Sequence, residues 1–389
     1  MGLRIGLRIG LLYSRFASMP QALWAALRAD GHDVIRPEDL HIRTPMSAED
    51  MAHFARLAAP DVIFCPFLKE VVPPEVCERT TTWIPHPGIR GDRGPSSLSW
   101  AILEGARSWG LTMVRAEPAR AADELDGGNV GPWREFAMPT GANMGEVYAQ
   151  HIIPAAIDCA YEILAQMAVD PAYSGVPLAS FGLAAVGRHR PALGQDRLAF
   201  TWDDRPDQIL RHIRAAPFGV RTELGDQPVN AYDAHPHDVT GDRSKRLGTR
   251  ADRPGQLLAH RDGAVLVATG AGGAVWIGHA KVKRGDGGQG LKLPAIHAVG
   301  AQLAGVGESV LPVGRLPGPH LRGRPLPPRG PGGMALRRAL QRRRLDGVLR
   351  PATGRAAVRR QPGHQRDRPG RRQCRLEQRD PPRGHRGRR

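Results

Sequence analysis

The stretch Ile84–Ile102 reads IPHPGIRGDRGPSSLSWAI and marks a place where the chain leaves a strand and enters a loop. The eleven residues 85–95 contain three glycines and three prolines. Both residue types weaken helices and strands, so we interpret this segment as a binding loop carried by a rigid scaffold. His86 follows the short apolar run Thr81–Ile84. The pattern therefore predicts that His86 lies where a strand ends and a ligand begins.

Working outward from this loop, short apolar runs alternate with segments of helical periodicity. Ser18 is expected to cap a first helix, a second is expected from Ser96 to Ala106, and a longer one over Gly145–Met167 with a kink at Pro154. The expected strands lie at residues 8–13, 31–35, 61–65, 81–84 and 110–114. This alternation predicts an α/β fold with a doubly wound, mostly parallel sheet, whose ligands bind beyond the carboxyl ends of the strands.

Composition divides the 389 residues into four parts. Residues 1–168 form the expected α/β domain, and residues 169–200 are expected to be a linker. Residues 201–283 contain short apolar runs separated by Gly or Asp turns, which predicts a small β-barrel. Residues 284–389 are expected to be a linker and an Arg/Pro/Gly-rich, disordered tail, because such a composition buries too little apolar surface to offset its ordering entropy. We expect residues 1–300 to form the stable unit.

The basic charge of the chain is confined to this tail. The formal net charge is +17, yet the residues after 310 contain 23 arginines and four acidic residues. Residues 1–310 contain 32 basic and 34 acidic residues and are close to neutral. We therefore expect contact with nucleic acid only as non-specific binding through the tail.

The tail also lacks residue types that the rest of the chain uses. No lysine follows Lys292, and no Phe, Trp, Tyr or Ile follows residue 310. A GC-rich gene that is read out of frame yields Arg, Pro, Gly and Ala. We hypothesise a shift of reading frame between about residues 300 and 340; a genuine Arg-rich tail is the alternative.

Cysteine usage and hydropathy indicate a cytoplasmic protein without a metal site. The four cysteines form no CxxC pair and no His/Cys cluster with zinc spacing, which predicts free thiols in a reducing compartment. The sequence contains no run of about 18 apolar residues, so we expect no membrane span. The amino terminus lacks the pattern of a signal peptide. The segment Asp233–Asp238 is expected to be a turn between barrel strands, and Gly270–Gly273 a hairpin turn.

The loop around His86 resembles the folate-dependent formyltransferases. The form His-Pro-Gly-Ile-x-Gly-Asp-Arg-Gly-Pro-Ser-Ser-Leu is similar to the HypX-type branch of that family, which serves hydrogenase maturation. The resemblance covers about residues 4–300 and implies a formyltransferase fold with a catalytic domain followed by a small barrel. The matching pieces are His86-Pro87, Arg93-Gly94, Trp100-Ala101-Ile102, Gly110-Leu111-Thr112 and Leu125-Asp126-Gly127-Gly128.

The resemblance implies a reaction and a set of site residues. A formyl group would pass from 10-formyltetrahydrofolate to an acceptor, coenzyme A, through a tetrahedral intermediate that needs proton transfer and an oxyanion donor. His86 and Asp126 match the catalytic pair of the family. Gly88, Ile89, Arg93 and Gly94 match its folate loop, although Arg93 has an ion pair with Asp92 as an alternative role. Ile84 stands where the family has an Asn.

Two other functions remain open from the sequence. Methionyl-tRNA formyltransferase is one, although the near-neutral barrel region lacks the basic face that tRNA binding requires. A non-catalytic polyanion-binding protein, acting through the tail, is the other. For formyl transfer to coenzyme A, we expect small-molecule substrates and hydrogenase maturation proteins as partners, and no contact with a membrane.

Overall fold

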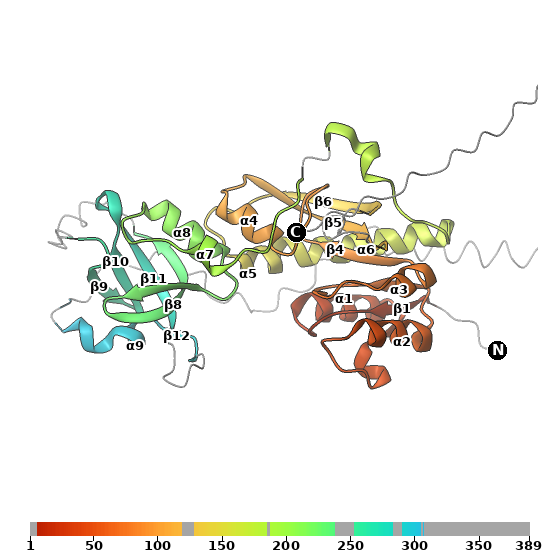
Figure 1. The fold of residues 1–389 in the computed structure, drawn as a ribbon, viewed down its shortest axis with the longest axis horizontal. Coiled ribbons are helices and arrows are strands. Elements are labelled where there is room, and N and C mark those ends of the chain that lie inside the picture. Colours follow the sequence, from red (N-terminus) through yellow and green to blue (C-terminus); the bar gives the residue numbers. More distant parts are fainter. Residues whose placement is uncertain are drawn as a thin grey trace, which may run out of the picture. The chain divides into compact units, whose positions relative to one another are not determined.

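The computed structural model describes residues 6–118, 128–184, 187–237, 253–282, 290–304 and 306. All of these belong to one compact unit, residues 1–343. Two sheets organise it, one in the first half of the described chain and one in the second (Figure 1).

The first sheet has the order β2-β1-β3-β4-β5-β6. Neighbouring strands from β2 to β4 are parallel, as the sequence predicts, whereas β5 and β6 continue the sheet in antiparallel pairing. β6 is not among the strands that the sequence analysis predicts. The strands are β1 Arg8–Leu11, β2 Asp33–Ile35, β3 Val62–Phe64, β4 Thr82–His86, β5 Ser108–Arg115 and β6 Val130–Ala137.

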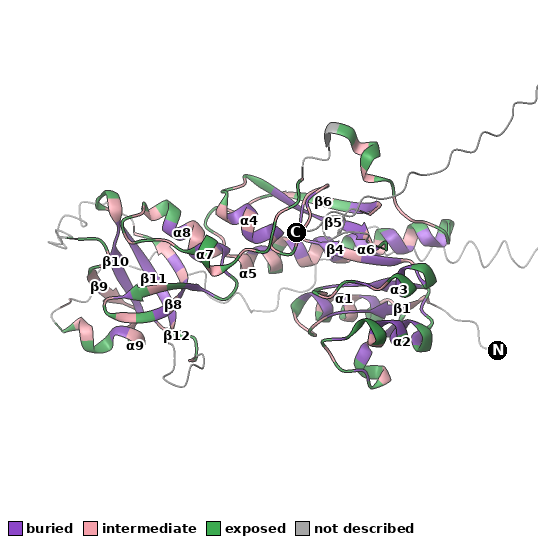
Figure 2. Ribbon diagram, viewed as in Figure 1, coloured by how far each residue is buried: buried purple, intermediate pink, exposed green. Residues whose placement is uncertain are grey.

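Helices cover both faces of this sheet, and alternate residues of each central strand supply the two cores. In β3, Val62 and Phe64 face a cluster that includes α1 (Ser18–Ala29), whereas Ile63 faces α2 (Ala48–Ala58) and α3 (Pro74–Arg79). Figure 2 shows the resulting band of buried residues along the central strands. The two-sided burial explains why these strands read as continuous apolar runs.

Helix starts follow local chemistry, with one correction. Ser47 caps α2 by accepting a hydrogen bond from the Asp50 amide, and the Asp50 carboxylate accepts one from Ser47 in return. Ser18 does not cap α1: it is the first helical residue, after the extended Ala17, and no side chain caps this end. The second predicted helix is α4, Ser97–Leu103, which follows the His86 loop.

The long apolar helix is interrupted by a π turn. It consists of α5 (Met144–Val147), the π turn Tyr148–Ile152 and α6 (Ile153–Val169). Pro154 lies in the first turn of α6, where its missing amide disturbs the regular hydrogen-bond pattern of the preceding turn. Within the described residues, Met144–Val169 is the one helix long and apolar enough to cross a membrane. Its buried face packs against α1, β5 and β6 in the protein core.

The second sheet is antiparallel, with the order β7-β8-β11-β10-β9, and β12 pairs with β11. The pairings among the described residues do not close it into the predicted barrel. The predicted turn at Asp233–Asp238 is wrong for its first four residues, because Asp233–Pro236 belong to β8; Asp238 lies outside the described residues. The elements are α7 Gln195–Leu198, α8 Pro206–Ala215, β7 Val220–Leu224, β8 Gln227–Pro236, β9 Leu257–Arg261, β10 Ala264–Ala268, β11 Ala274–Val282, β12 Leu293–Pro294 and α9 Ile296–Val299.

Trp83 is the largest fully buried side chain of the first sheet. It stacks on Tyr173 with 5.8 Å between ring centroids, and Gly131 and Gly175 leave room for its ring. We expect Trp83→Ala to lower the free energy of unfolding by about 3–5 kcal/mol in urea denaturation. Phe218→Ala, at a ring that is 68% exposed, is the control and is expected to change it by less than about 0.5 kcal/mol. Equal losses in the two variants would contradict this packing.

Candidate active site

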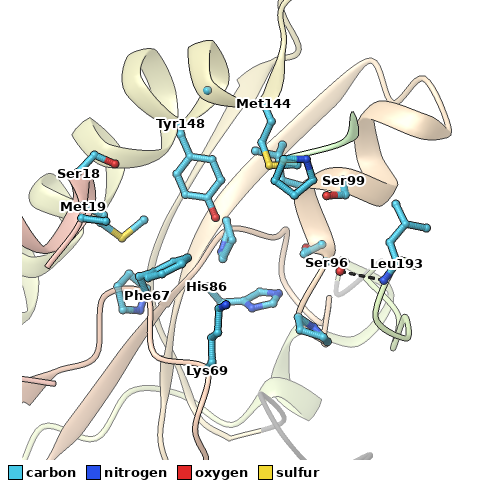
Figure 3. Close-up of a pocket in the computed structure, with 18 of the residues that line it drawn as sticks. Ser18, Met19, Phe67, Lys69, His86, Ser96, Ser99, Met144, Tyr148 and Leu193 are labelled. Carbon is cyan, nitrogen blue, oxygen red and sulfur yellow. Dashed lines mark hydrogen bonds between the residues drawn. The ribbon is translucent and has the colours of Figure 1, made fainter. Parts of the chain in front are cut away.

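A cavity of about 1850 Å³ opens at the carboxyl ends of the parallel strands of the first sheet. His86 is the last residue of β4 and lies at the inner wall of the cavity. Phe67 and Lys69 reach the cavity from the loop after β3. Tyr148, on the π turn, lines the opposite side (Figure 3). This is the position that the sequence predicts for His86, because ligands of open α/β sheets bind beyond the strand ends.

His86 is buried, at 4% exposure, and its ring is held by Asp92. The His86 Nε2 atom lies 3.1 Å from Asp92 Oδ2. A carboxylate in this position fixes the orientation of an imidazole ring and stabilises its charged form. Nδ1 is then the ring nitrogen that is turned away from Asp92.

The Asp92 side chain is wholly buried and has two further partners. The Ser97 hydroxyl, in the first turn of α4, donates to the same Oδ2 atom. Arg190 places a guanidinium nitrogen 2.5 Å from Oδ1. Both carboxylate oxygens are therefore occupied, which is the condition under which a buried charge is tolerated.

Glycine at position 88 is required by this pair. A Cβ atom on Gly88 would lie 2.6 Å from His86 Nε2 and 2.7 Å from Asp92 Oδ2, closer than real Cβ contacts. The carbonyl of Gly88 accepts a hydrogen bond from the Thr112 hydroxyl at 2.8 Å, which fixes the loop to β5. Gly88 therefore packs directly on the His86–Asp92 pair.

The other predicted folate residues occupy different surroundings. Arg93 and Gly94 line the cavity. Ile89 is half-buried and packs against the core. The alternative prediction of an ion pair between Arg93 and Asp92 is wrong, because the Asp92 carboxylate points inward and contacts His86 and Arg190.

Asp126, the predicted partner of His86, lies outside the described residues. The carboxylate that meets His86 in the described part of the chain is Asp92, six residues along the same loop. The sequence holds one usable signal for it. Asp92 is the single acid of a Gly- and Pro-rich loop, at a distance from His86 that a tight turn can close.

Two further polar groups, Tyr148 and Lys69, line the same cavity. Burial raises the pKa of the Tyr148 phenol to about 12, so this group stays protonated and can donate a hydrogen bond at neutral pH. In Figure 3 the Tyr148 hydroxyl points into the cavity toward the side of His86. Lys69 extends from its loop into the same space. Among the described residues no group of His, Cys, Asp and Glu side chains is arranged to hold a metal ion.

Comparison with known proteins agrees with this architecture. Residues 193–287 match the family described as formyl transferase, C-terminal domain. The hydrogenase maturation factor HoxX of Bradyrhizobium diazoefficiens is 33% identical over 306 residues, which cover 77% of this chain and 48% of HoxX.

Solved structures of HypX from Aquifex aeolicus have the same fold. A multiply substituted variant is 30% identical with a TM-score of 0.64, and covers 78% of this chain and 49% of that one. A complex with tetrahydrofolic acid is 29% identical with a TM-score of 0.65, and covers 78% of this chain and 48% of that one. The chain spans about half the length of the relatives it matches. Over the part that aligns with these relatives, the chain is a HypX-like protein with the formyltransferase fold.

Proposed function

We propose that this chain transfers a formyl group from 10-formyltetrahydrofolate as a cytoplasmic step in the maturation of [NiFe]-hydrogenase. The observation that carries the proposal is the buried His86–Asp92 pair at the wall of a cavity at the strand ends. The tetrahydrofolic acid complex of the HypX relative supports a folate as donor. Hydrogenase maturation proteins are the proposed partners, because the curated relative is a hydrogenase maturation factor.

The proposed acceptor is coenzyme A. Its thiol attacks the formyl carbon, a C–S bond forms, the bond from carbon to N10 breaks, and the thiol proton moves to N10. The products are formyl-coenzyme A and tetrahydrofolate, with no oxidant or reductant required. His86 carries the proton, and Asp92 stabilises the imidazolium that forms.

The roles of the remaining predicted residues follow from their positions. Arg93 and Gly94 line the cavity and are proposed to contact the folate. Gly88 and Ile89 shape the loop behind them. Asp126 is retained as a second carboxylate for His86, on the resemblance alone.

The first test is His86→Ala in an assay that follows loss of 10-formyltetrahydrofolate with each acceptor. We expect coenzyme A to consume the formyl donor and the variant to be slower by about 10²–10⁴-fold, the usual contribution of a general acid–base group. His53→Ala, at an exposed position on α2, should be unaffected. Turnover with methionyl-tRNA instead of coenzyme A would identify the other formyltransferase activity, and unchanged turnover in His86→Ala would remove His86 from the mechanism.

The second test is Gly88→Ala, which adds one methyl group between the His86 and Asp92 side chains. We expect it to separate the pair and to lower the turnover number by about 10²-fold or more, because sub-ångström positioning of a catalytic group controls its efficiency. Gly300→Ala is the matched control, since its added methyl meets no atom within 4 Å. Full activity in Gly88→Ala would show that the His86–Asp92 contact is dispensable.

The third test addresses the oxyanion, which Ile84 cannot stabilise. We propose that the Tyr148 hydroxyl donates to it, and we expect Tyr148→Phe to lower the turnover number by about 10²-fold. Tyr161→Phe is the control, because that hydroxyl bonds the Ala26 carbonyl at 2.9 Å.

The pH dependence of the rate provides a further check on the role of Tyr148. Deprotonation removes a phenol donor, but the raised pKa of about 12 keeps Tyr148 protonated through moderately alkaline pH. The rate ratio of wild type to Tyr148→Phe should therefore stay constant between about pH 8 and pH 10, the range in which an ordinary tyrosine begins to ionise. A ratio that falls across this range would contradict the assignment.

A further inference from the structure

The loop that holds Asp92 is bound by a distant part of the chain. We call residues 187–193 the strap. The strap lies in the predicted linker and follows the loop over several residues, with Leu193 donating to the Ser96 hydroxyl at 3.0 Å (Figure 3). Three backbone hydrogen bonds join strap and loop: Gly187 N–H to Arg90 O at 2.9 Å, Arg93 N–H to Arg188 O at 3.2 Å, and Arg190 N–H to Arg93 O at 2.9 Å.

Arg190 directs its guanidinium inward from the strap. One nitrogen, Nη1, lies 2.5 Å from Asp92 Oδ1, and the other, Nη2, lies 2.7 Å from Glu104 Oε2. The side chain is 12% exposed, and its guanidinium carbon lies 5.5 Å from the centre of the Trp109 ring. Two carboxylates and an aromatic ring therefore fix the planar fork of Arg190, a geometry that lysine cannot reproduce.

Glycines on both sides of the seam permit this close approach. A Cβ atom on Gly94, which has φ +107°, would lie 2.0 Å from the Arg190 carbonyl oxygen. A Cβ atom on Gly187 would lie 1.9 Å from the Asp92 amide nitrogen. The sequence thus provides a glycine at each point where the strap and the loop meet most closely, one on each partner.

We propose that Arg190 is a positioning residue for formyl transfer. Its guanidinium holds the buried Asp92 carboxylate in place, and Asp92 in turn orients the His86 ring. Arg190 therefore belongs to the active site, although it is 98 residues away from Asp92 in the sequence. The kinetic part of this inference rests on the proposed function of His86.

Arg188 supplies a matched control on the same strap. It also pairs with Glu104, at 3.0 Å, but its side chain is 68% exposed. A variant at this position removes a cation from the strap and from Glu104 without changing the Arg190–Asp92 contact. Exposed ion pairs of this kind contribute little, so Arg188→Gln should behave as the wild type.

The kinetic experiment compares Arg190→Gln, Arg190→Lys and Arg188→Gln in the full chain. We expect Arg190→Gln to lower the turnover number at least about tenfold while the KM for the folate changes less than about threefold, because the transition state is affected and not folate binding. Arg190→Lys should recover part of the loss, since an ammonium can still pair with Asp92. Equal turnover in Arg190→Gln and Arg188→Gln would overturn the proposal.

A double-variant cycle with Asp92→Asn identifies the route of the effect. If Arg190 acts through Asp92, the double variant turns over no more slowly than Asp92→Asn alone, within about threefold. Independent, multiplicative losses would overturn the proposal. Urea denaturation of each variant separates a loss of folded protein from a loss of activity, and Arg190→Lys keeps the test open should Arg190→Gln fail to fold.

An NMR measurement tests the same contact without substrate. With ¹⁵N-labelled histidine, the Nε2 chemical shift of His86 reports its hydrogen bond to Asp92. We expect this chemical shift to change in Arg190→Gln and to keep its wild-type value in Arg188→Gln. An unchanged shift in both would overturn the positioning role. A wild type without formyl transfer would refute the proposed function alone, because the chemical shift still reports on Arg190.

Discussion

The buried carboxylate of Asp92 is the constraint on which the rest of this site depends. A charge without access to water must be compensated on each of its oxygens, and removal of one partner is strongly unfavourable. Here the compensation comes from His86, Ser97 and Arg190, which lie on a strand end, a helix start and a distant strap. One carboxylate therefore fixes the relative positions of three segments, and the ring of His86 is held as a consequence.

This constraint also explains the glycines and the segment boundaries. A side chain at Gly88 would collide with the His86–Asp92 pair, one at Gly94 with the strap, and one at Gly187 with the loop backbone at Asp92. The predicted boundary at residue 168 separates the α/β domain from residues 187–193, which hydrogen-bond to its active-site loop. A fragment that ends at residue 168 would leave Asp92 without its cation.

Much of this arrangement follows from local sequence, and the rest does not. The parallel strands read clearly because burial on both faces makes them apolar throughout, and His86 follows from its place after such a strand. Arg190 could not be found in this way, because its pairing with Asp92 spans 98 residues and arginines are common in this chain. The turn predicted at Asp233 failed because the half-buried Asp233 lies within β8 and pairs its carboxylate with His279 of β11 and with Lys292. Ser18 failed as a cap because α1 begins at Ser18 itself, one residue earlier than the sequence pattern predicts.

The most direct measurement of the central claim, that His86 works on a folate in this cavity, is a crystal structure of the chain with tetrahydrofolate bound. The account predicts that N10 of the folate lies within hydrogen-bond reach of His86, about 2.6–3.2 Å or through one water, with the His86–Asp92 contact preserved. A folate bound elsewhere, or a His86 ring turned away from both the ligand and Asp92, would contradict it.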